Sequence, residues 1–169
     1  MVTKTMLKNS IEAKWRKYNR NLFIVFFCLA LLLEVFLSSY TFSTVEDFLK
    51  VVGITLLSTS PLLITLMIFT IYYGVKYHKT CEVLDDYKIY EVVLDQPSVS
   101  LWHKRSFYYE VTFVTAEKKT KTKDTPPLFG AAFFYDVEIS DYNNKKIYIA
   151  YSNKEDRMIV LGKNLEEEY

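Results

Sequence analysis

The sequence predicts a membrane α plus all-β protein, in which a two-helix transmembrane hairpin precedes a small antiparallel β barrel or sandwich. Two long apolar blocks lie before Lys76, and short alternating segments replace any helical period after Lys79. Tyrosine and phenylalanine, with 14 and 12 copies in 169 residues, suit both membrane interfaces and strands. These observations divide the chain into a membrane part and a β domain.

The N-terminal flank, residues 1–21, is basic and carries apolar residues at helical spacing. Leu7, Ile11 and Trp15 recur every four residues, with basic residues between them. The pattern predicts an amphipathic helix on the inner leaflet, and the alternative is a basic flank that only sets the topology. The candidate residues for lipid headgroups and topology are Lys14, Trp15, Arg16, Lys17 and Arg20, together with Lys76 and Lys79 after the second helix.

We expect transmembrane helices at residues 22–41 and 51–75, joined by a short outward loop at 42–50. The apolar blocks Leu22 to Tyr40 and Val51 to Tyr73 are close to the roughly 20 residues that a helix needs to cross a bilayer core. A secretory signal peptide is the alternative for the first block. That block is longer than an h-region of about 7 to 15 residues, and no Ala-x-Ala-like cleavage site follows it.

The charged residues beside the helices predict their orientation. Lysines and arginines precede the first helix and follow the second, whereas the connecting loop carries Glu46 and Asp47. Under the positive-inside rule, both termini are cytoplasmic and the loop faces outward. We therefore expect a multi-pass protein of the plasma membrane, with the lipid bilayer as its first partner.

An acidic residue, Glu34, interrupts the first apolar block. Antiparallel helices with a turn near residues 45 and 46 place it opposite hydroxyl residues of the second helix, and small or hydroxyl side chains allow such helices to approach and hydrogen bond. The candidates for intramembrane polar packing or partner contact are Ala30, Glu34, Ser38, Thr55, Ser58 and Thr59. Pro61 predicts a helix kink near Ser58, where neighbouring hydroxyls can satisfy the carbonyl that loses its donor.

Three roles for Glu34 compete. It can hold the hairpin or a homo-oligomer together, bind another membrane protein, or carry protons or ions. An acid at the bilayer centre costs about 2.5 to 3.5 kcal/mol on insertion scales, so we expect a neutral acid that hydrogen bonds if it faces protein. Neither apolar block contains a second charged residue, which argues against a transporter that acts alone.

The cytoplasmic region, residues 76–163, has the pattern of an all-β domain. Tyr109, Val111 and Phe113 alternate with polar residues, as in a half-buried strand. We predict a turn at 116–118, a loop over the prolines in TPPLFGAA, and an acidic tail at 164–169. The expected strands are YKIYEVVL, SVSLW, SFYYEVTFVTA, KKTKTKDT, FFYDVEIS, KKIYIAY and RMIVLG.

Residues that could carry chemistry are few. His78 and Cys81 have the spacing of metal ligands, but only the distant His103 could join them, and a structural zinc site usually needs four protein ligands. The chain has only four glycines and shows no phosphate-binding loop or nucleophile elbow. We therefore expect no catalytic residue, no metal and no cofactor.

The basic run in KKTKTK also has two readings. Lys118, Lys119, Lys121 and Lys123 could contact lipid headgroups or nucleic acid, or they could protect an exposed edge strand from aggregation. A formal net charge of +1 gives no support to nucleic acid as a partner. The edge strand is therefore the favoured reading.

The last 65 or so residues resemble the β domain of uncharacterised bacterial two-pass membrane proteins. The segments FYYEVTFVTA and NNKKIYIAYSNKEDRMIVLG carry the resemblance. The hallmark of that family is roughly Gly-x-x-Val-x-Val-x-Tyr-x-Pro, in which Ile147, Ile149 and Tyr151 match, while Asn144 and Asn153 replace the glycine and the proline. The resemblance implies a fold and a membrane location, transfers no catalytic residue, and gives a hint of toxin–immunity or secretion systems.

The sequence thus predicts a noncatalytic integral membrane protein that acts by binding another protein. We expect a membrane or secreted partner, which would make the chain a membrane-embedded immunity protein or an accessory subunit of a membrane complex. A homo-oligomer is a further expectation. The alternative is a subunit of a transporter or channel that uses Glu34 as its ionisable group.

Overall fold

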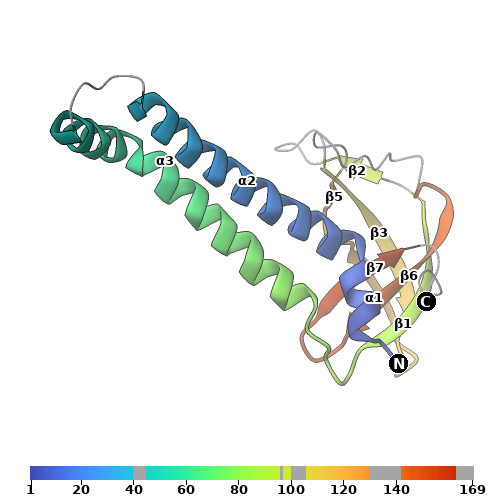
Figure 1. Cartoon of the computed structure of the whole chain (residues 1–169). Coiled ribbons are helices and arrows are strands. Elements are labelled where there is room, and N and C mark those ends of the chain that lie inside the picture. The colour runs from blue at the N-terminus through green and yellow to red at the C-terminus, as the bar shows by residue number, and fades with distance from the viewer. Residues whose placement is uncertain (40–44, 96, 100–105, 130–141, 163–169) are drawn as a thin grey trace. The chain divides into compact units, whose positions relative to one another are not determined.

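The computed structural model describes residues 1–39, 45–95, 97–99, 106–129 and 142–162, and the chain divides into two compact units (Figure 1). A helical unit contains Arg16–Tyr77. A β unit contains Met1–Trp15 and His78–Tyr169. The prediction of long apolar helices followed by antiparallel sheets is confirmed.

Two long helices, α2 (Ile11–Ser39) and α3 (Val45–Thr80), supply the helical unit. Their segments Ile11–Phe36 and Leu57–Thr80 are long and apolar enough to cross a membrane. Helix α3 begins inside the segment 42–50 that the sequence assigned to a loop, and α2 begins inside the flank 1–21. An acidic first turn suits the start of α3, because Glu46 and Asp47 interact favourably with the helix dipole.

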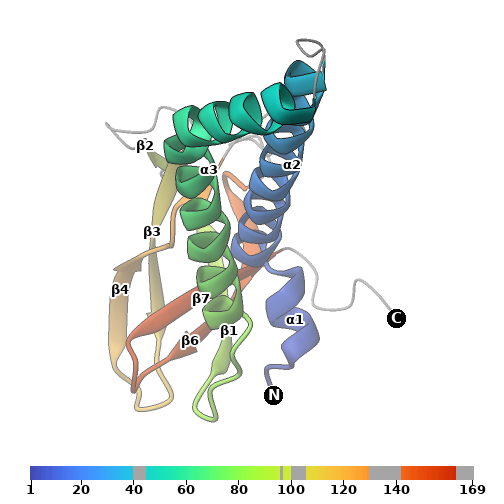
Figure 2. The ribbon, with the colours of Figure 1, turned by 60° about the vertical axis from the view of Figure 1, so that its left-hand side comes forward.

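Helix α3 changes direction along its length, as Figure 2 shows where its colour passes from teal to green. Pro61 lies within this helix and cannot donate a backbone hydrogen bond to the carbonyl of Leu57. The hydroxyl of Ser60 donates to that carbonyl at 2.8 Å, and Thr65 Oγ1 donates to the carbonyl of Pro61 at 2.7 Å. Hydroxyl groups that bond back to the helix are associated with bends, and the Ser60 hydroxyl replaces the backbone donor that Pro61 lacks.

The β unit contains two antiparallel sheets. One has the strand order β1-β6-β7, and the other has the order β2-β3-β4, with β5 also paired to β3. The described strands form no closed barrel, so the barrel that the sequence allowed is not seen. The strands are β1 (Lys88–Leu94), β2 (Pro97–Val99), β3 (Ser106–Val114), β4 (Thr120–Asp124), β5 (Leu128–Phe129), β6 (Lys145–Ser152) and β7 (Arg157–Gly162).

One hydrophobic cluster draws on both sheets. Alternate side chains of the strands enter it, as the period of two along a strand requires, and Tyr109, Val111, Ile147 and Ile149 are completely buried. Ile11 of helix α2 belongs to the same cluster. The core of the β unit therefore includes a residue from the N-terminal part of the chain.

A second cluster lies on the other face of β6 and β7. Ala150 and Ile159 enter it from these strands and pack with Leu7 of the short helix α1 (Lys4–Asn9). Leu7 and Ile11 are thus buried against the β unit, and they are not available for the inner leaflet, contrary to the lipid-bound helix that the sequence suggested. Strand β7 is buried on both faces because α1 covers the side that the other sheet does not.

Ser10 joins α1 to α2 without leaving a buried polar group unpaired. Its hydroxyl donates to the carbonyl of Leu7 at 2.6 Å and accepts the backbone N–H of Ala13 at 3.2 Å. Ser10 is completely buried. The same side chain therefore ends one helix and caps the next, as serine commonly does at a helix N-terminus.

Among the residues that the structure describes, three non-glycine residues with positive φ lie in turns before or between strands. Lys118, in the predicted turn at 116–118, has φ of 59°, and its N–H donates to Thr115 at 2.9 Å. Asn144 has φ of 55° and Asp156 has φ of 48°. Asparagine and aspartate tolerate this region better than most residues, which accounts for Asn144 at the position where the resemblance expects glycine.

The predicted loop TPPLFGAA contains a strand. Leu128 and Phe129 pair with Phe107 and Ser106 as β5. Pro126 and Pro127 separate β5 from β4 because neither can donate to a ladder. The predicted strand FFYDVEIS lies outside the described residues.

Thr125, which lies between β4 and the two prolines, continues the hydrogen bonding to β3. Its N–H donates to the carbonyl of Tyr109 at 2.8 Å, and its hydroxyl accepts the N–H of Tyr109 at 3.0 Å. The side chain replaces the carbonyl that a regular strand would offer. Thr125 is buried, so water cannot take over this role.

Replacement of Thr125 by valine is expected to destabilise the β unit by about 1 to 3 kcal/mol, because it leaves the buried N–H of Tyr109 unpaired. Urea unfolding of the purified chain in detergent, followed by near-UV circular dichroism, measures this change. Thr122→Val is the matched control, since the Thr122 hydroxyl pairs with Thr112 at an exposed position. Equal midpoints for the two variants would contradict the role of Thr125.

Candidate functional site

The helical unit is held in register by contacts along its length. The Arg16 side chain donates to the carbonyl of Lys76 at 2.8 Å. The ring of Phe23 stacks on Phe69 and Tyr73, with centroid distances of 5.1 and 5.6 Å. Each residue further along α2 thus contacts one earlier in α3, so the two helices are antiparallel neighbours.

Glu34 and Thr59 meet in this unit. The hydroxyl of Thr59 donates to Glu34 Oε1. Only 8% of Glu34 is exposed, and its second oxygen, Oε2, is buried without a hydrogen-bond partner among the described residues. A buried acid with one bonded and one unbonded oxygen is the strongest functional candidate in the helical unit, because an unsatisfied buried group is costly.

The other predicted residues of this site have different positions. Ala30 is half-buried on α2, and Ser58 is exposed on α3. Ser38 and Thr55 lie within the helices, but their side chains are outside the described part of the structure. The structure therefore brings together Glu34 and Thr59 from the predicted set.

Apolar side chains cover much of the outside of the helical unit. On α2, Leu32, Leu33 and Val35 are 65%, 58% and 63% exposed. Along α3, Leu62, Ile64, Ile68, Ile71 and Val75 are also exposed. None of the most apolar window of α3 is buried, unlike the core helix of a soluble protein.

The predicted topology residues lie at the ends of the helices. Lys14 and Lys17 are exposed, and Trp15 is half-buried. Arg20 lies over the ring of Tyr77, at 5.5 Å from its centroid, and Lys76 lies over Tyr72 at 5.7 Å. The backbone carbonyl of Lys79 accepts a hydrogen bond from Arg157 in the β unit.

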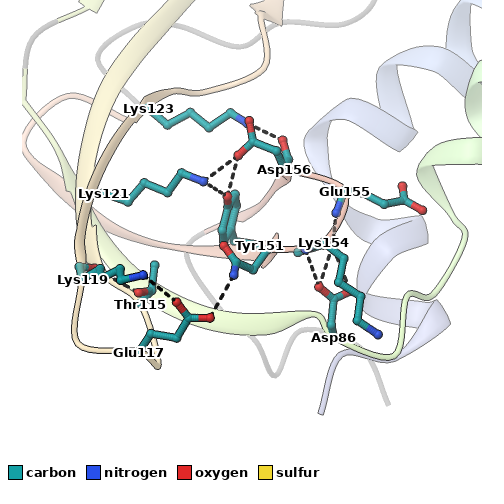
Figure 3. Close-up of polar contacts among 12 residues, drawn as sticks. Asp86, Thr115, Glu117, Lys119, Lys121, Lys123, Tyr151, Lys154, Glu155 and Asp156 are labelled. Carbon is teal, nitrogen blue, oxygen red and sulfur yellow. Dashed lines mark hydrogen bonds and ion pairs between the residues drawn. The ribbon is translucent and has the colours of Figure 1, made fainter.

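A second polar group links the two sheets of the β unit (Figure 3). Lys121 and Lys123, from β4, both point to Asp156 in the turn before β7, at 2.8 Å from Oδ1 and 2.7 Å from Oδ2. The hydroxyl of Tyr151, from β6, donates to Asp156 Oδ1 at 2.5 Å and accepts from Lys121. We call these four residues the lysine clamp.

Charge and hydrogen bonding shift the pKa values of the clamp. Hydrogen bonds from Lys121, Lys123 and Tyr151 hold the pKa of Asp156 well below its usual range. Asp156 and Tyr151 raise the pKa of Lys121, and burial raises the pKa of Tyr151. The clamp therefore keeps its charges at neutral pH.

Sequence reasoning missed the clamp. It treated the lysines as a solvated edge, whereas Lys121 and Lys123 are half-buried and bound to Asp156. Their spacing of two along a strand was an available signal, since it puts both on one face. The sequence offered no means of finding Asp156, because the turn that carries it belongs to the other sheet.

A further acidic side chain, Asp86, stabilises the same turn. It accepts from the hydroxyl of Ser152 and from the N–H of Lys154, each at 2.9 Å. The Lys154 N–H is the main cause that lowers the pKa of Asp86. The segment between α3 and β1 is thereby tied to the β6–β7 turn.

Metal ligation finds little support in the described residues. They contain no group of three histidine, cysteine or acidic side chains that could hold a metal ion. Cys81 is buried and His78 is exposed, while His103 lies outside the described ranges. The His78–Cys81 pair thus gains no further ligand from this part of the chain.

No protein-family model, curated protein or solved structure matches this chain. The resemblance to bacterial two-pass membrane proteins therefore stays a prediction.

The lysine clamp makes a testable contribution to acid stability. Because the folded pKa of Asp156 is depressed, the clamp stabilises the β unit above the unfolded pKa of about 3.9, and this stability is lost progressively as the pH falls from that value toward the lower folded pKa. Asp156→Asn should lower the urea midpoint at pH 7 and reduce its fall between about pH 4 and pH 2. Asp124→Asn, a change of an exposed residue on β4, is the control. An unchanged pH profile in Asp156→Asn would refute the clamp.

Tyr87 contrasts with Tyr151, whose hydroxyl donates a hydrogen bond to Asp156. The Tyr87 hydroxyl is buried and has no hydrogen-bond partner among the residues that the structure describes, and burial raises its pKa to about 12. Tyr87→Phe is therefore expected to stabilise the β unit by about 1 kcal/mol, whereas Tyr151→Phe, which removes a bonded hydroxyl, should cost about as much.

The same shift predicts an alkaline response. Since the folded pKa of Tyr87 lies above the unfolded value, stability falls as the pH rises from about 10 toward 12. Tyr87→Phe should reduce this slope in thermal unfolding followed by circular dichroism. A less stable Tyr87→Phe protein would show that the hydroxyl has a partner.

Proposed function

We propose that this chain is a noncatalytic integral membrane protein that acts by binding another protein. The membrane placement rests on the exposed apolar side chains of both helices, among them Leu32, Leu33 and Val35. In water each such side chain has an unfavourable hydration cost, and in lipid that cost disappears. The two spans then cross the plasma membrane and carry the β unit at one side.

The basic residues support a cytoplasmic position for both termini. Arg16, Lys17 and Arg20 lie at the start of α2, and Lys76 lies near the end of α3, whereas Glu46 and Asp47 lie at the other end of the hairpin. The positive-inside rule assigns the basic end to the cytoplasm. The β unit, which is continuous in the chain with that end, is then cytoplasmic.

Glu34 is the observation that carries the binding proposal. Thr59 satisfies one of its oxygens, and Oε2 has no described hydrogen-bond partner although it is buried. Hydrocarbon contains no water to complete the bonding, so a polar group from another membrane helix would relieve the cost. A small adjustment of the hairpin would bring Oε2 into contact with such a group.

The partner that this argument favours is a membrane protein, or a secreted protein that enters the membrane. Glu34 would make such a contact if the chain is an immunity protein that neutralises a membrane-active toxin, or if it is an accessory subunit of a membrane complex. A second copy of the chain would satisfy Glu34 in the same way. The rival function is a transporter or channel subunit in which Glu34 exchanges protons or ions, and the buried, half-bonded acid is also the feature that favours it.

Photo-crosslinking in native membranes tests the proposal. With a photoreactive amino acid at Ala30, beside Glu34 on α2, we expect one specific protein adduct. Glu34→Leu should reduce that adduct by at least tenfold, whereas Glu34→Gln should retain it because the amide still donates and accepts hydrogen bonds. The same photoreactive residue at the exposed position Leu33 is the matched control.

Two outcomes would contradict the binding proposal. One is an adduct at Ala30 that Glu34→Leu leaves unchanged. The other is a pH-driven ion flux in reconstituted vesicles that Glu34→Gln alone abolishes, which would favour the transporter subunit.

A further inference from the structure

An open groove of about 480 Å³ lies along the first half of α3. Its wall is a stripe at helical spacing, so a single face of the helix makes it. Gly53 leaves a gap between the side chains of this stripe, since a Cβ atom there would meet nothing within 4 Å. The lining residues are Leu49, Lys50, Gly53, Ile54, Leu57 and Ser58.

A charged pair marks one end of the groove. Lys50 Nζ lies 3.2 Å from Glu46 Oε1, and the two side chains are 66% and 82% exposed. An exposed ion pair contributes little to stability, so both groups can exchange partners at small cost. The Lys50 ammonium and the Glu46 carboxylate are therefore both available to a ligand at the end of the apolar groove.

The position of this pair along the helix corresponds to the headgroup level. The apolar span of α3 begins at Leu57. Lys50 precedes Leu57 by two helical turns, or about 10 Å at 1.5 Å per residue. In the proposed orientation, the groove descends from the outer headgroups toward the hydrocarbon.

We propose that this groove binds a zwitterionic phospholipid whose headgroup ends in a primary ammonium. One acyl chain lies along Gly53, Ile54 and Leu57. The phosphate accepts hydrogen bonds from Lys50, and the ammonium donates to Glu46. This inference rests on the membrane placement given under the proposed function.

The charges at this end select the headgroup. Glu46 and Asp47 outnumber Lys50 there, so a purely anionic lipid meets net repulsion. A headgroup with both signs complements the pair. A trimethylated ammonium carries the same charge but has no N–H, so it cannot donate a hydrogen bond to Glu46.

Native mass spectrometry of the full chain tests the site. The protein is reconstituted in nanodiscs with equal parts of phosphatidylethanolamine, phosphatidylcholine and phosphatidylglycerol, and the lipids that remain bound are counted. We expect phosphatidylethanolamine to exceed phosphatidylcholine several-fold. Glu46→Gln should abolish that preference, and Lys50→Gln and Gly53→Leu should reduce the retention of every phospholipid.

Lys145→Gln, an exposed charge change on β6, is the matched control and should retain the wild-type pattern. Equal retention of the three lipids by the wild-type chain, a preference for phosphatidylglycerol, or a dimer without lipid would overturn the proposal. Protease protection of the same nanodiscs separates this failure from that of the proposed function. If the chain is inserted but shows no preference, the lipid site alone is wrong, and if the chain is not inserted, the membrane placement is wrong.

Discussion

Exclusion of apolar surface from water is the constraint on which the rest of this structure depends. The helical unit leaves Leu32, Leu33 and Val35 uncovered, together with similar residues of α3. At about 25 cal/mol for each Å² of apolar area, such a surface cannot face water without a large cost. A hydrocarbon environment removes the cost but also removes water as a hydrogen-bonding partner. Each polar group of the helices then needs a partner within protein.

Pro61 and Glu34 show two responses to that second requirement. Beside Pro61 the chain supplies its own donor, since Ser60 bonds to the carbonyl of Leu57. Glu34 is satisfied only in part, because Thr59 reaches one oxygen and Oε2 is left without a described partner. Near Pro61, the hydroxyl of Ser60 takes the place of the backbone donor that the proline lacks. The Glu34 side chain leaves a buried carboxyl oxygen without a described hydrogen-bond partner.

In the β unit, other parts of the protein cover the apolar surface and keep it from water. The sheet that contains β3 packs on one face of β6 and β7, and Leu7 of α1 and its neighbours cover the other face. The folded unit therefore comprises Met1–Trp15 as well as the region after His78. In the lysine clamp of this unit, Asp156 lies within 2.8 Å of both Lys121 and Lys123. Asp156, Lys121 and Lys123 thus link the sheets without a buried unpaired ion.

The sequence alone determined the two apolar helices and the strands β1, β3, β6 and β7, because hydropathy and periodicity are local properties. The pairing of Glu34 with Thr59 also follows from the spacing of residues about the turn. The tertiary structure decided three other features. It buries Leu7 and Ile11 against the sheets, pairs Leu128 with β3, and places Asp156 within ion-pair distance of Lys121 and Lys123. Each of these joins segments far apart in the chain. A local pattern shows that a residue is apolar or charged, and only the fold brings the surface or the opposite charge that it meets.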